Sequence, residues 1–354
     1  MKNEFISDLL IHNQHQLGIE LPNNMIFDVN IIRKTSEHRS VCLTILDQSN
    51  KKIGVLKFPL NKSEITNQAI LHEYRTILDL QKKFAFFNNV PDPKGKLFFD
   101  QRIFILYDYF EHKMLFELIE AMGLEFNPIL FTIPINWLFN FNKQSSIIKK
   151  LDKSFINEFE KKIFARVNIY PDENIKVATH KLWGIFKPHF YALCKINLPF
   201  VNTHSDFNPW NLGVGKNQQL VVFDWEDYLE SFPVLIDFFY FIIVFFWVLF
   251  FSYQEDVPFD NIIKAYQTFY ELINHYLNLY QKEYQMLNNE VIDTLFIFFL
   301  FHNTLMDLEE KRKSTPDLVF RWLEIINGYK PGNFFLNYFS PDKWIPILKE
   351  QRNK

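Results

Sequence analysis

Residues 204–211 read His-Ser-Asp-Phe-Asn-Pro-Trp-Asn, and residues 224–226 read Asp-Trp-Glu. In the first stretch, the carboxylate of Asp206 is followed five positions later by the amide of Asn211. The second stretch follows residues 220–223, an apolar run typical of a short buried strand. A strand that ends in a carboxylate holds that group on a rigid element. Together the two stretches predict a polar site that offers oxygen ligands.

These residue types fit one reaction class, the transfer of a phosphoryl group from a nucleotide. That reaction needs a carboxylate to orient or deprotonate the attacking hydroxyl, metal ligands, and a cation on the phosphates. Asp206 suits the first role. Asn211 and Asp224 suit the second, because amide and carboxylate oxygens are ligands that Mg²⁺ accepts.

The spacing from His204 to Asp206 and Asn211 resembles the catalytic loop of the aminoglycoside phosphotransferase and choline kinase superfamily, which has a protein-kinase-like fold. Residues 224–226 resemble the metal-binding aspartate segment of that superfamily. The resemblance implies that Asp206 is the catalytic aspartate and that His204 braces the loop by hydrogen bonds. It also implies that Asn211 and Asp224 are the two ligands of Mg²⁺.

The resemblance extends to Asp237, which matches an aspartate that caps a buried helix and ties it to the catalytic loop. Residues 238–254 form a run of 17 residues without a charge. A membrane span needs about 20 apolar residues, so this run favours a buried core helix over a membrane span. The resemblance implies that it is the central helix of the larger lobe, and we expect no membrane association. Ser205 departs from the family pattern, which commonly has glycine at this position.

The first 110 residues predict a small sheet with one helix. Apolar and β-branched runs predict strands over 27–33, 40–46, 52–58, 96–99 and 102–109, and residues 47–50 have the chemistry of a turn. Asn61, with Glu64 three positions later, predicts the cap of a helix that ends near Lys83. The resulting order of elements is β-β-β-α-β-β, and the pattern beyond it is predominantly helical.

Lys57 lies in the third predicted strand, at the place of the family lysine that contacts nucleotide phosphates. Glu73 matches its ion-pair partner. It shares one face of the predicted helix with Ile70, Ile77 and Leu80, so a carboxylate is expected among apolar neighbours. Residues 107–110 are expected to link the lobes where adenine binds. The turn at residues 35–39 contains no glycine, so the glycine-rich phosphate loop is absent there.

Composition excludes several other classes of protein. A length of 354 residues suggests two lobes. A net charge of -3 provides no positive electrostatic field that would attract nucleic acid, so we expect no nucleic-acid partner. Cys42 and Cys194 form no metal-spacing motif, and the first 20 residues lack a signal sequence, so a cytoplasmic location is expected. We expect Trp210 and Trp225 to be packing residues.

The sequence thus predicts an α+β, two-lobed, protein-kinase-like fold. Residues 1–110 are expected to form a nucleotide-binding lobe with a small antiparallel sheet, and residues 111–354 a helical lobe. The expected activity is phosphorylation of a hydroxyl group on an amino alcohol, sugar or aminoglycoside-like molecule. ATP or GTP would be the donor, with Mg²⁺ as cofactor. The last 100 residues offer no motif.

Three alternatives are open at this point, of which one is a membrane-tethered protein that uses residues 238–254; the other two concern the site. The first is a catalytically silent kinase-like binding module, because the glycine-rich loop is missing. The second is a metal-dependent hydrolase that uses His204, Asp206, Asp224 and His302, although the amide of Asn211 is a poor ligand for zinc.

Overall fold

The computed structural model describes residues 3–17, 25–32, 40–84, 87, 90–122, 126–251, 258–308 and 316–352. The chain divides into two compact units. Unit 1 comprises Met1–Lys113 and Asn211–Tyr228, and unit 2 comprises Met114–Trp210 and Leu229–Lys354. Unit 1 is therefore assembled from two separate stretches of chain. The division into a nucleotide-binding lobe of residues 1–110 and a helical lobe of residues 111–354 stays a prediction.

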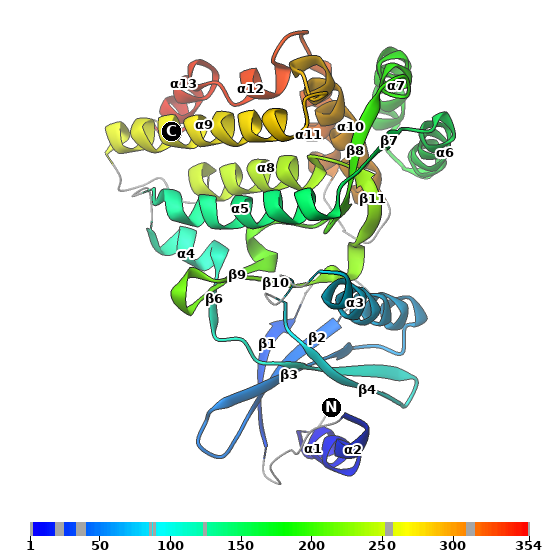
Figure 1. The fold of residues 1–354 in the computed structure, drawn as a ribbon, viewed down its shortest axis with the longest axis vertical. Helices are drawn as coiled ribbons and strands as arrows, with labels where there is room; N and C mark the ends of the chain where they lie inside the picture. Colours follow the sequence, from blue (N-terminus) through cyan, green and yellow to red (C-terminus); the bar gives the residue numbers. More distant parts are fainter. Residues whose placement is uncertain are drawn as a thin grey trace. The chain divides into compact units, whose positions relative to one another are not determined.

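Unit 1 contains most of the strands (Figure 1). Its elements are α1 (Asn3–His12), α2 (Gln14–Leu17), β1 (Ile26–Ile32), β2 (Ser40–Leu46), β3 (Lys52–Pro59), α3 (Glu64–Lys83), β4 (Pro93–Phe99), β5 (Arg102–Asp108), β6 (His112–Met114, whose last residue belongs to unit 2), β9 (Leu212–Gly215), β10 (Leu220–Val222) and the 3-10 turns η2 (Lys216–Gln218) and η3 (Trp225–Asp227).

The larger sheet of unit 1 has the strand order β1-β2-β3-β5-β4, and all of its neighbouring strands are antiparallel. The predicted order β-β-β-α-β-β is confirmed. The predicted turn at residues 47–50 is also present, where the Asp47 carboxylate accepts the backbone N–H groups of Ser49 and Lys51. The helix cap at Asn61 was predicted wrongly. Ser63 is the N-cap, because its hydroxyl accepts the N–H of Thr66.

Each face of this sheet has its own neighbours. Leu56 and Phe58 point to a core shared with Ile6 and Leu10 of α1. Side chains alternate along a strand, so Lys57 lies on the opposite face. On that face the helix α3 buries the predicted row of Ile70, Glu73, Ile77 and Leu80. The sheet thereby separates an apolar core from the face that carries a charged side chain.

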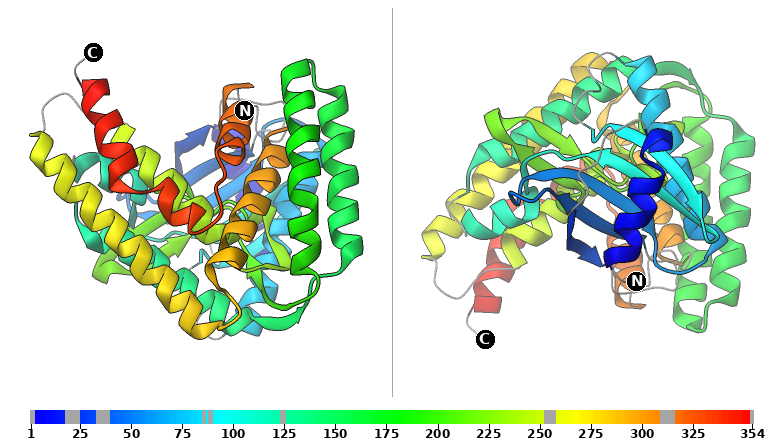
Figure 2. Two further views of the ribbon diagram at one scale, coloured as in Figure 1. Left: turned by 90° about the horizontal axis from the view of Figure 1, so that it is seen from above. Right: turned by 90° about the horizontal axis from the view of Figure 1, so that it is seen from below.

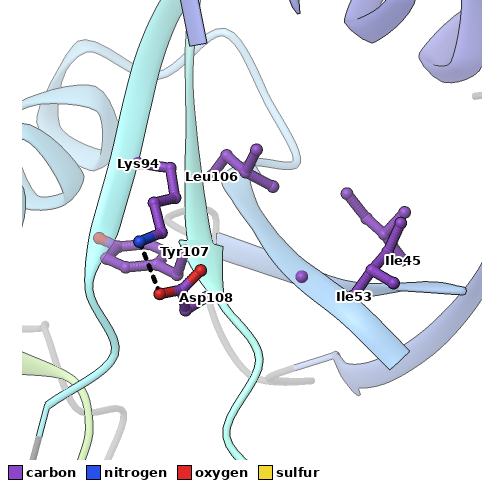
Figure 3. Close-up of a pocket in the computed structure, with 7 residues that line it drawn as sticks. Ile45, Ile53, Lys94, Leu106, Tyr107 and Asp108 are labelled. Atoms are coloured by element: carbon purple, nitrogen blue, oxygen red, sulfur yellow. Dashed lines mark ion pairs between the residues drawn. The ribbon is translucent and has the colours of Figure 1, made fainter. Parts of the chain in front are cut away.

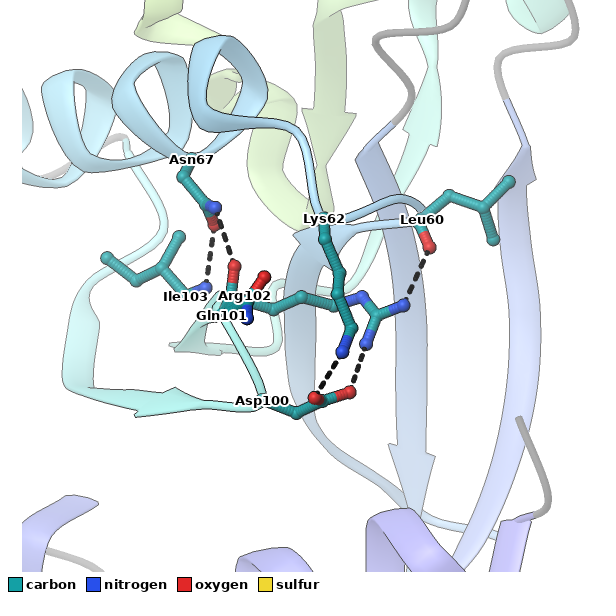
Figure 4. Close-up of polar contacts among 7 residues, drawn as sticks. All are labelled: Leu60, Lys62, Asn67, Asp100, Gln101, Arg102 and Ile103. Atoms are coloured by element: carbon teal, nitrogen blue, oxygen red, sulfur yellow. Dashed lines mark hydrogen bonds and ion pairs between the residues drawn. The ribbon is translucent and has the colours of Figure 1, made fainter.

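Asn67 fastens α3 to the hairpin of β4 and β5 (Figure 4). Its amide donates to the carbonyl of Gln101 (2.9 Å) and accepts the N–H of Ile103 (2.8 Å). The hairpin turns at Asp100 and Gln101, which both have positive φ, as a tight two-residue turn requires. Asp100 is in turn held by Lys62 and Arg102. These contacts fix the helix that carries Glu73 against the sheet that carries Lys57.

Unit 2 is mostly helical (Figures 1 and 2). Its elements are α4 (Leu115–Met122), α5 (Pro128–Ser145), β7 (Ile147–Lys150), α6 (Lys153–Ile169), α7 (Glu173–Leu193), β8 (Asn197–Thr203), the turn η1 (Pro209–Asn211, whose last residue belongs to unit 1), β11 (Leu229–Pro233), α8 (Ile236–Phe251), α9 (Phe259–Glu283), α10 (Asn289–Leu308), α11 (Pro316–Asn327), α12 (Phe334–Tyr338) and α13 (Pro341–Arg352). The predicted α+β class is confirmed, although the short strands β7, β8 and β11 were not foreseen.

Two helices of unit 2 are strongly apolar. The predicted core helix is α8, which ends at Phe251. The rest of the predicted run, residues 252–254, lies outside the described residues. Twelve of the sixteen residues of α8 are buried, as expected for a helix that is apolar all round in a folded protein. Among the described helices, α10 alone is long and apolar enough to cross a membrane, and 89% of its apolar window is buried inside the protein.

Candidate functional site

Lys57 is a buried lysine on β3, where it lies opposite Cys42 of β2. Only 6% of the residue is exposed. Its Nζ forms ion pairs with the carboxylate of Glu73 on α3 and with that of Asp224 (2.9 Å), which follows β10. The expected pair of Lys57 and Glu73 is therefore present, and Asp224 joins it as a second anion.

Electrostatics keep Lys57 charged. Burial on its own lowers the pKa of a lysine, because the charged form loses its hydration. Here the carboxylates of Asp224, Glu73 and Glu226 outweigh burial and hold the pKa of Lys57 well above its usual value. The lysine is a fixed cation with two anionic neighbours at hydrogen-bonding distance.

Strand pairing brings Asn211 and Asp224 together. β9 and β10 are antiparallel, with Leu212 opposite Val222. The next residues outward are Asn211 and Phe223, and the N–H of Phe223 donates to the carbonyl of Asn211 (2.9 Å). Asp224 follows at once. The two predicted metal ligands, 13 positions apart in sequence, thus lie at the same end of one two-stranded ladder.

The backbone at Asp224 is strained. Its φ of 64° and ψ of 59° place it in the left-handed region, which costs a non-glycine residue about 1–3 kcal/mol. Before it, the three residues of β10 are buried, and after it Trp225 is fully buried with its ring against Phe87 (centroids 5.0 Å apart). Firm packing on both sides holds the aspartate in this conformation. The prediction that Trp225 is a packing residue is confirmed.

The donor set at this end of the ladder fits a hard divalent cation. Asn211 supplies an amide oxygen and Asp224 a carboxylate, the ligand types that Mg²⁺ takes alongside water and phosphate oxygens. Among the described residues, no group of three or more His, Cys, Asp or Glu side chains is placed to hold a metal ion.

In unit 2, β8 leads into the segment that contains His204 and Asp206. His204 is fully buried, and its Nδ1 accepts the N–H of Asp206 (3.3 Å). The carboxylate of Asp237, at the start of α8, accepts the N–H groups of His204 (2.7 Å) and Ser205 (2.8 Å). The helix start is therefore tied to the loop, as the resemblance implied.

The backbone conformation of Ser205 explains why the family pattern commonly has glycine at this position. Its φ is 65°, in the left-handed region that glycine adopts without a steric penalty. Serine tolerates this conformation here because its N–H is bound by Asp237 and its hydroxyl lies 3.1 Å from that of Thr203. The departure from the family pattern is thus accommodated locally.

Asp237 is itself an unusual carboxylate, with only 2% of the residue exposed. Burial raises the pKa of Asp237 to about 6, although the ring of His204 and the two N–H groups act in the opposite direction. The pKa lies just below neutrality because the hydrogen bonds only partly replace the lost hydration.

The sequence reasoning missed Asn208. This residue is buried, and its amide donates both to the carboxylate of Asp206 (3.0 Å) and to the carbonyl of the same residue (3.1 Å). Its amide oxygen accepts the N–H of Trp210 (2.9 Å). An asparagine that binds the backbone two residues further on is a common turn device, so the spacing alone was a usable signal.

Other candidate residues have less to do with chemistry. Trp210 is half exposed, so its packing role is smaller than predicted. His302 of α10 is buried beside the rings of Phe232 and Phe159. The glycine-free turn at residues 35–39 lies outside the described residues.

One small pocket lies near the ends of β3 and β5 (Figure 3). Its volume is about 40 Å³, enough for one or two water molecules. It is lined by Gly54 and Leu106 among others, and Lys94 pairs with Asp108 (2.7 Å) at its edge. Tyr107 and Asp108, from the segment 107–110 that is expected to bind adenine, line this pocket, whereas Lys57 and Glu73 do not.

The fold and the side chains together define a class of protein. The order of elements in unit 1, with a strand lysine paired to a glutamate of the following helix, is the organisation expected of the protein-kinase-like fold. The mostly helical unit 2 completes this α+β organisation.

Comparison with known proteins gives particular neighbours. No family profile and no curated protein sequence matches the chain. Among solved structures, an aminoglycoside phosphotransferase from Alicyclobacillus acidocaldarius is 9% identical, with 95% of this chain and 97% of that chain covered and a TM-score of 0.43. A glucosamine kinase in complex with glucosamine, ADP and inorganic phosphate is 11% identical, with 92% and 82% covered and a TM-score of 0.45. A choline kinase from Streptococcus pneumoniae is 16% identical, with 97% and 99% covered and a TM-score of 0.47.

These three neighbours belong to the superfamily that the sequence resembles. Their identities of 9–16% and TM-scores of 0.43–0.47 describe a distant likeness, from which no activity follows for this chain. Function is therefore inferred from its own side chains.

Proposed function

We propose that the chain is a nucleotide-dependent phosphotransferase that phosphorylates a hydroxyl group of a small molecule, such as an amino alcohol, a sugar or an aminoglycoside. The observation that carries the proposal is the buried Lys57 held by Glu73 and Asp224. A lysine fixed in this way keeps both its charge and its position, which are the properties that a phosphate-binding cation needs.

The phosphate side of the reaction falls to unit 1. Lys57 would bind the phosphates of ATP or GTP, with Glu73 keeping the ammonium group in place. Asn211 and Asp224 would hold Mg²⁺, which when bound neutralises charge on the phosphates. The pairing of β9 with β10 supports this assignment, because it puts an amide and a carboxylate at one end of a ladder.

The acceptor side falls to Asp206. The acceptor hydroxyl oxygen would form a bond to the γ-phosphorus as the bond from that phosphorus to the bridging oxygen breaks. The nucleoside diphosphate leaves, and the hydroxyl proton passes to the carboxylate of Asp206. His204 braces the loop, and its backbone is tied down by Asp237, which supports a fixed position for the carboxylate.

The direct test is a screen for nucleotide consumption. Purified protein with MgATP or MgGTP would be offered a panel of amino alcohols, hexoses, amino sugars and aminoglycosides that includes choline, glucosamine and kanamycin. Release of nucleoside diphosphate that depends on one acceptor supports the proposal. Binding of MgATP or MgGTP without turnover on any acceptor would instead favour the silent binding module.

Asp206→Asn is the matched blank for this screen. The change is nearly isosteric, but the amide cannot accept the hydroxyl proton, so turnover should fall by about 10²–10⁴-fold. Stabilisation by MgATP should persist, because Lys57 and Asp224 are untouched. At 100 times the dissociation constant a ligand adds about 2.7 kcal/mol, which a thermal shift detects. Full turnover in the variant would overturn the role of Asp206.

A further inference from the structure

The proposed reaction gives Asn208 no role, although this residue contacts the carboxylate of Asp206, which would accept the proton. The residue is 5% exposed, which is uncommon for an asparagine, and its side-chain hydrogen bonds serve the segment from Asp206 to Trp210. A buried amide of this kind is kept in place by the bonds that it makes.

The hydrogen bonds of Asn208 fix its orientation. The side-chain nitrogen donates to the Asp206 carboxylate oxygen Oδ1 (3.0 Å) and to the Asp206 carbonyl (3.1 Å). The side-chain oxygen accepts the N–H of Trp210 (2.9 Å). Exchanging the two ends of the amide would set a donor against the N–H of Trp210 and an acceptor against both oxygens of Asp206. The nitrogen must therefore face Asp206.

Two consequences follow for Asp206. Because one nitrogen binds both the side chain and the main chain of Asp206, the rotation of its carboxylate about the Cα–Cβ bond is restrained. The bond is also made to Oδ1 alone by a neutral donor. Asn208 thus restrains the carboxylate of Asp206 through a neutral donor. A positively charged donor in its place would bind the anion more tightly.

We propose that Asn208 is a positioning residue that fixes one oxygen of the Asp206 carboxylate and thereby directs the other oxygen to the acceptor hydroxyl. The proposal rests on the proposed function, because it concerns the carboxylate assigned to the acceptor. Misplacing a reacting group by about 1 Å costs on the order of 10²-fold in rate, so a positioning role should appear in kcat.

The alternative is that Asn208 only closes the turn at residues 208–210. Asn208→Asp separates the two roles. An aspartate keeps the oxygen that accepts the N–H of Trp210, so the turn remains closed. It has no donor for Asp206 and places a second carboxylate at hydrogen-bonding distance from it. Asn208→Ala removes both functions.

The experiment measures kcat and KM for the wild type, Asn208→Asp and Asn208→Ala, with MgATP and the acceptor that the panel identifies. We expect kcat of Asn208→Asp to fall about 100-fold or more, at least as far as in Asn208→Ala, with KM for MgATP within about twofold of the wild type. In the Asp206→Asn background, Asn208→Ala should cause little further loss, because it acts through a group already removed.

Asn142→Ala is the matched control for loss of a buried amide. Asn142 is 2% exposed and donates to the Tyr280 hydroxyl (2.8 Å) within the same unit. This variant should lose stability while keeping kcat. If kcat of Asn208→Asp is within about threefold of the wild type, far from the loss of roughly 100-fold expected of a misplaced group, Asn208 only closes the turn and the inference is overturned. If the wild type itself turns over no acceptor, the proposed function fails and the inference fails with it.

Discussion

Asp237→Asn tests whether the buried carboxylate at the start of α8 is as unusual as its surroundings imply. The pKa of Asp237 is raised from 3.8 to about 6 in the folded protein. A group whose pKa is raised on folding adds stability below its unfolded pKa and loses it as the pH rises through the folded value. The free energy of unfolding should therefore fall between about pH 4 and pH 7 on account of this one group.

The magnitude follows from the shift. A change of about 2.2 pKa units, from 3.8 to about 6, at about 1.36 kcal/mol per unit gives about 3 kcal/mol in total, of which nearly half is lost between about pH 5 and pH 7. The introduced amide cannot ionise. It leaves one backbone N–H group facing an amide nitrogen, and the free-energy cost of that contact is the same at every pH. His204, Asp206 and Tyr280 interact electrostatically with the carboxylate of Asp237, and all three residues are present in both proteins.

The assay is urea unfolding of the wild type and of Asp237→Asn at intervals from about pH 4 to pH 7, the range that the raised pKa defines. The quantity of interest is the difference between the two free energies of unfolding, from which the titration of groups that do not interact with Asp237 cancels. This difference should move against the wild type by about 2.4 kcal/mol between about pH 4 and pH 7, because part of the total of about 3 kcal/mol is already lost at about pH 4. Parallel curves that keep a constant separation would refute the reasoning, because Asp237 would then ionise as an ordinary aspartate does.

Two further predictions concern buried charge and backbone strain. Lys57→Met removes the buried cation that pairs with the buried carboxylate of Glu73 and the partly buried one of Asp224, and it should cost about 3–5 kcal/mol in urea unfolding. Lys62→Met, whose ion pair with Asp100 is well exposed, should cost less than about 1 kcal/mol. Equal losses in the two variants would contradict the picture of Lys57 as a buried cation. Ser205→Val, a β-branched residue at positive φ, should lose more than about 2 kcal/mol in the same assay, while Ser205→Gly should change stability by less than about 1 kcal/mol. A well-tolerated valine would show that the loop relaxes out of the left-handed conformation.

Local patterns in the sequence predicted unit 1 well. The β2 range matched its predicted span, and β1, β3 and β5 differed by one residue at their ends, because each strand has a clear apolar pattern. The start of β4 at Pro93 was missed, since Pro93 and Gly95 are poor strand formers that pairing with β5 overrides. The cap at Ser63 was missed because Asn61 has equally suitable chemistry.

The candidate site was only partly readable from sequence. Lys57 and Glu73 could be paired through a resemblance and an apolar helix face, and the tie between Asp237 and the loop was expected. The approach of Asp224 to Lys57 depends on the pairing of β9 with β10, which contain four and three residues. Strands so short carry no periodicity from which pairing follows. Asn208 lies within the quoted motif, but its bond to Asp206 depends on the turn that the backbone adopts.

The discontinuity of unit 1 has a consequence for how the protein is made. Asp224 lies 167 positions after Lys57, so at a synthesis rate of roughly 5–20 residues per second it leaves the ribosome about 10–30 s later. During that interval the nascent sheet of β1 to β5 can form and pair its lysine with Glu73. The strands that complete unit 1 arrive only after the helices α4 to α7 have been synthesised. A ribosome stalled after residue 210 would therefore carry a lysine whose second anionic partner does not yet exist.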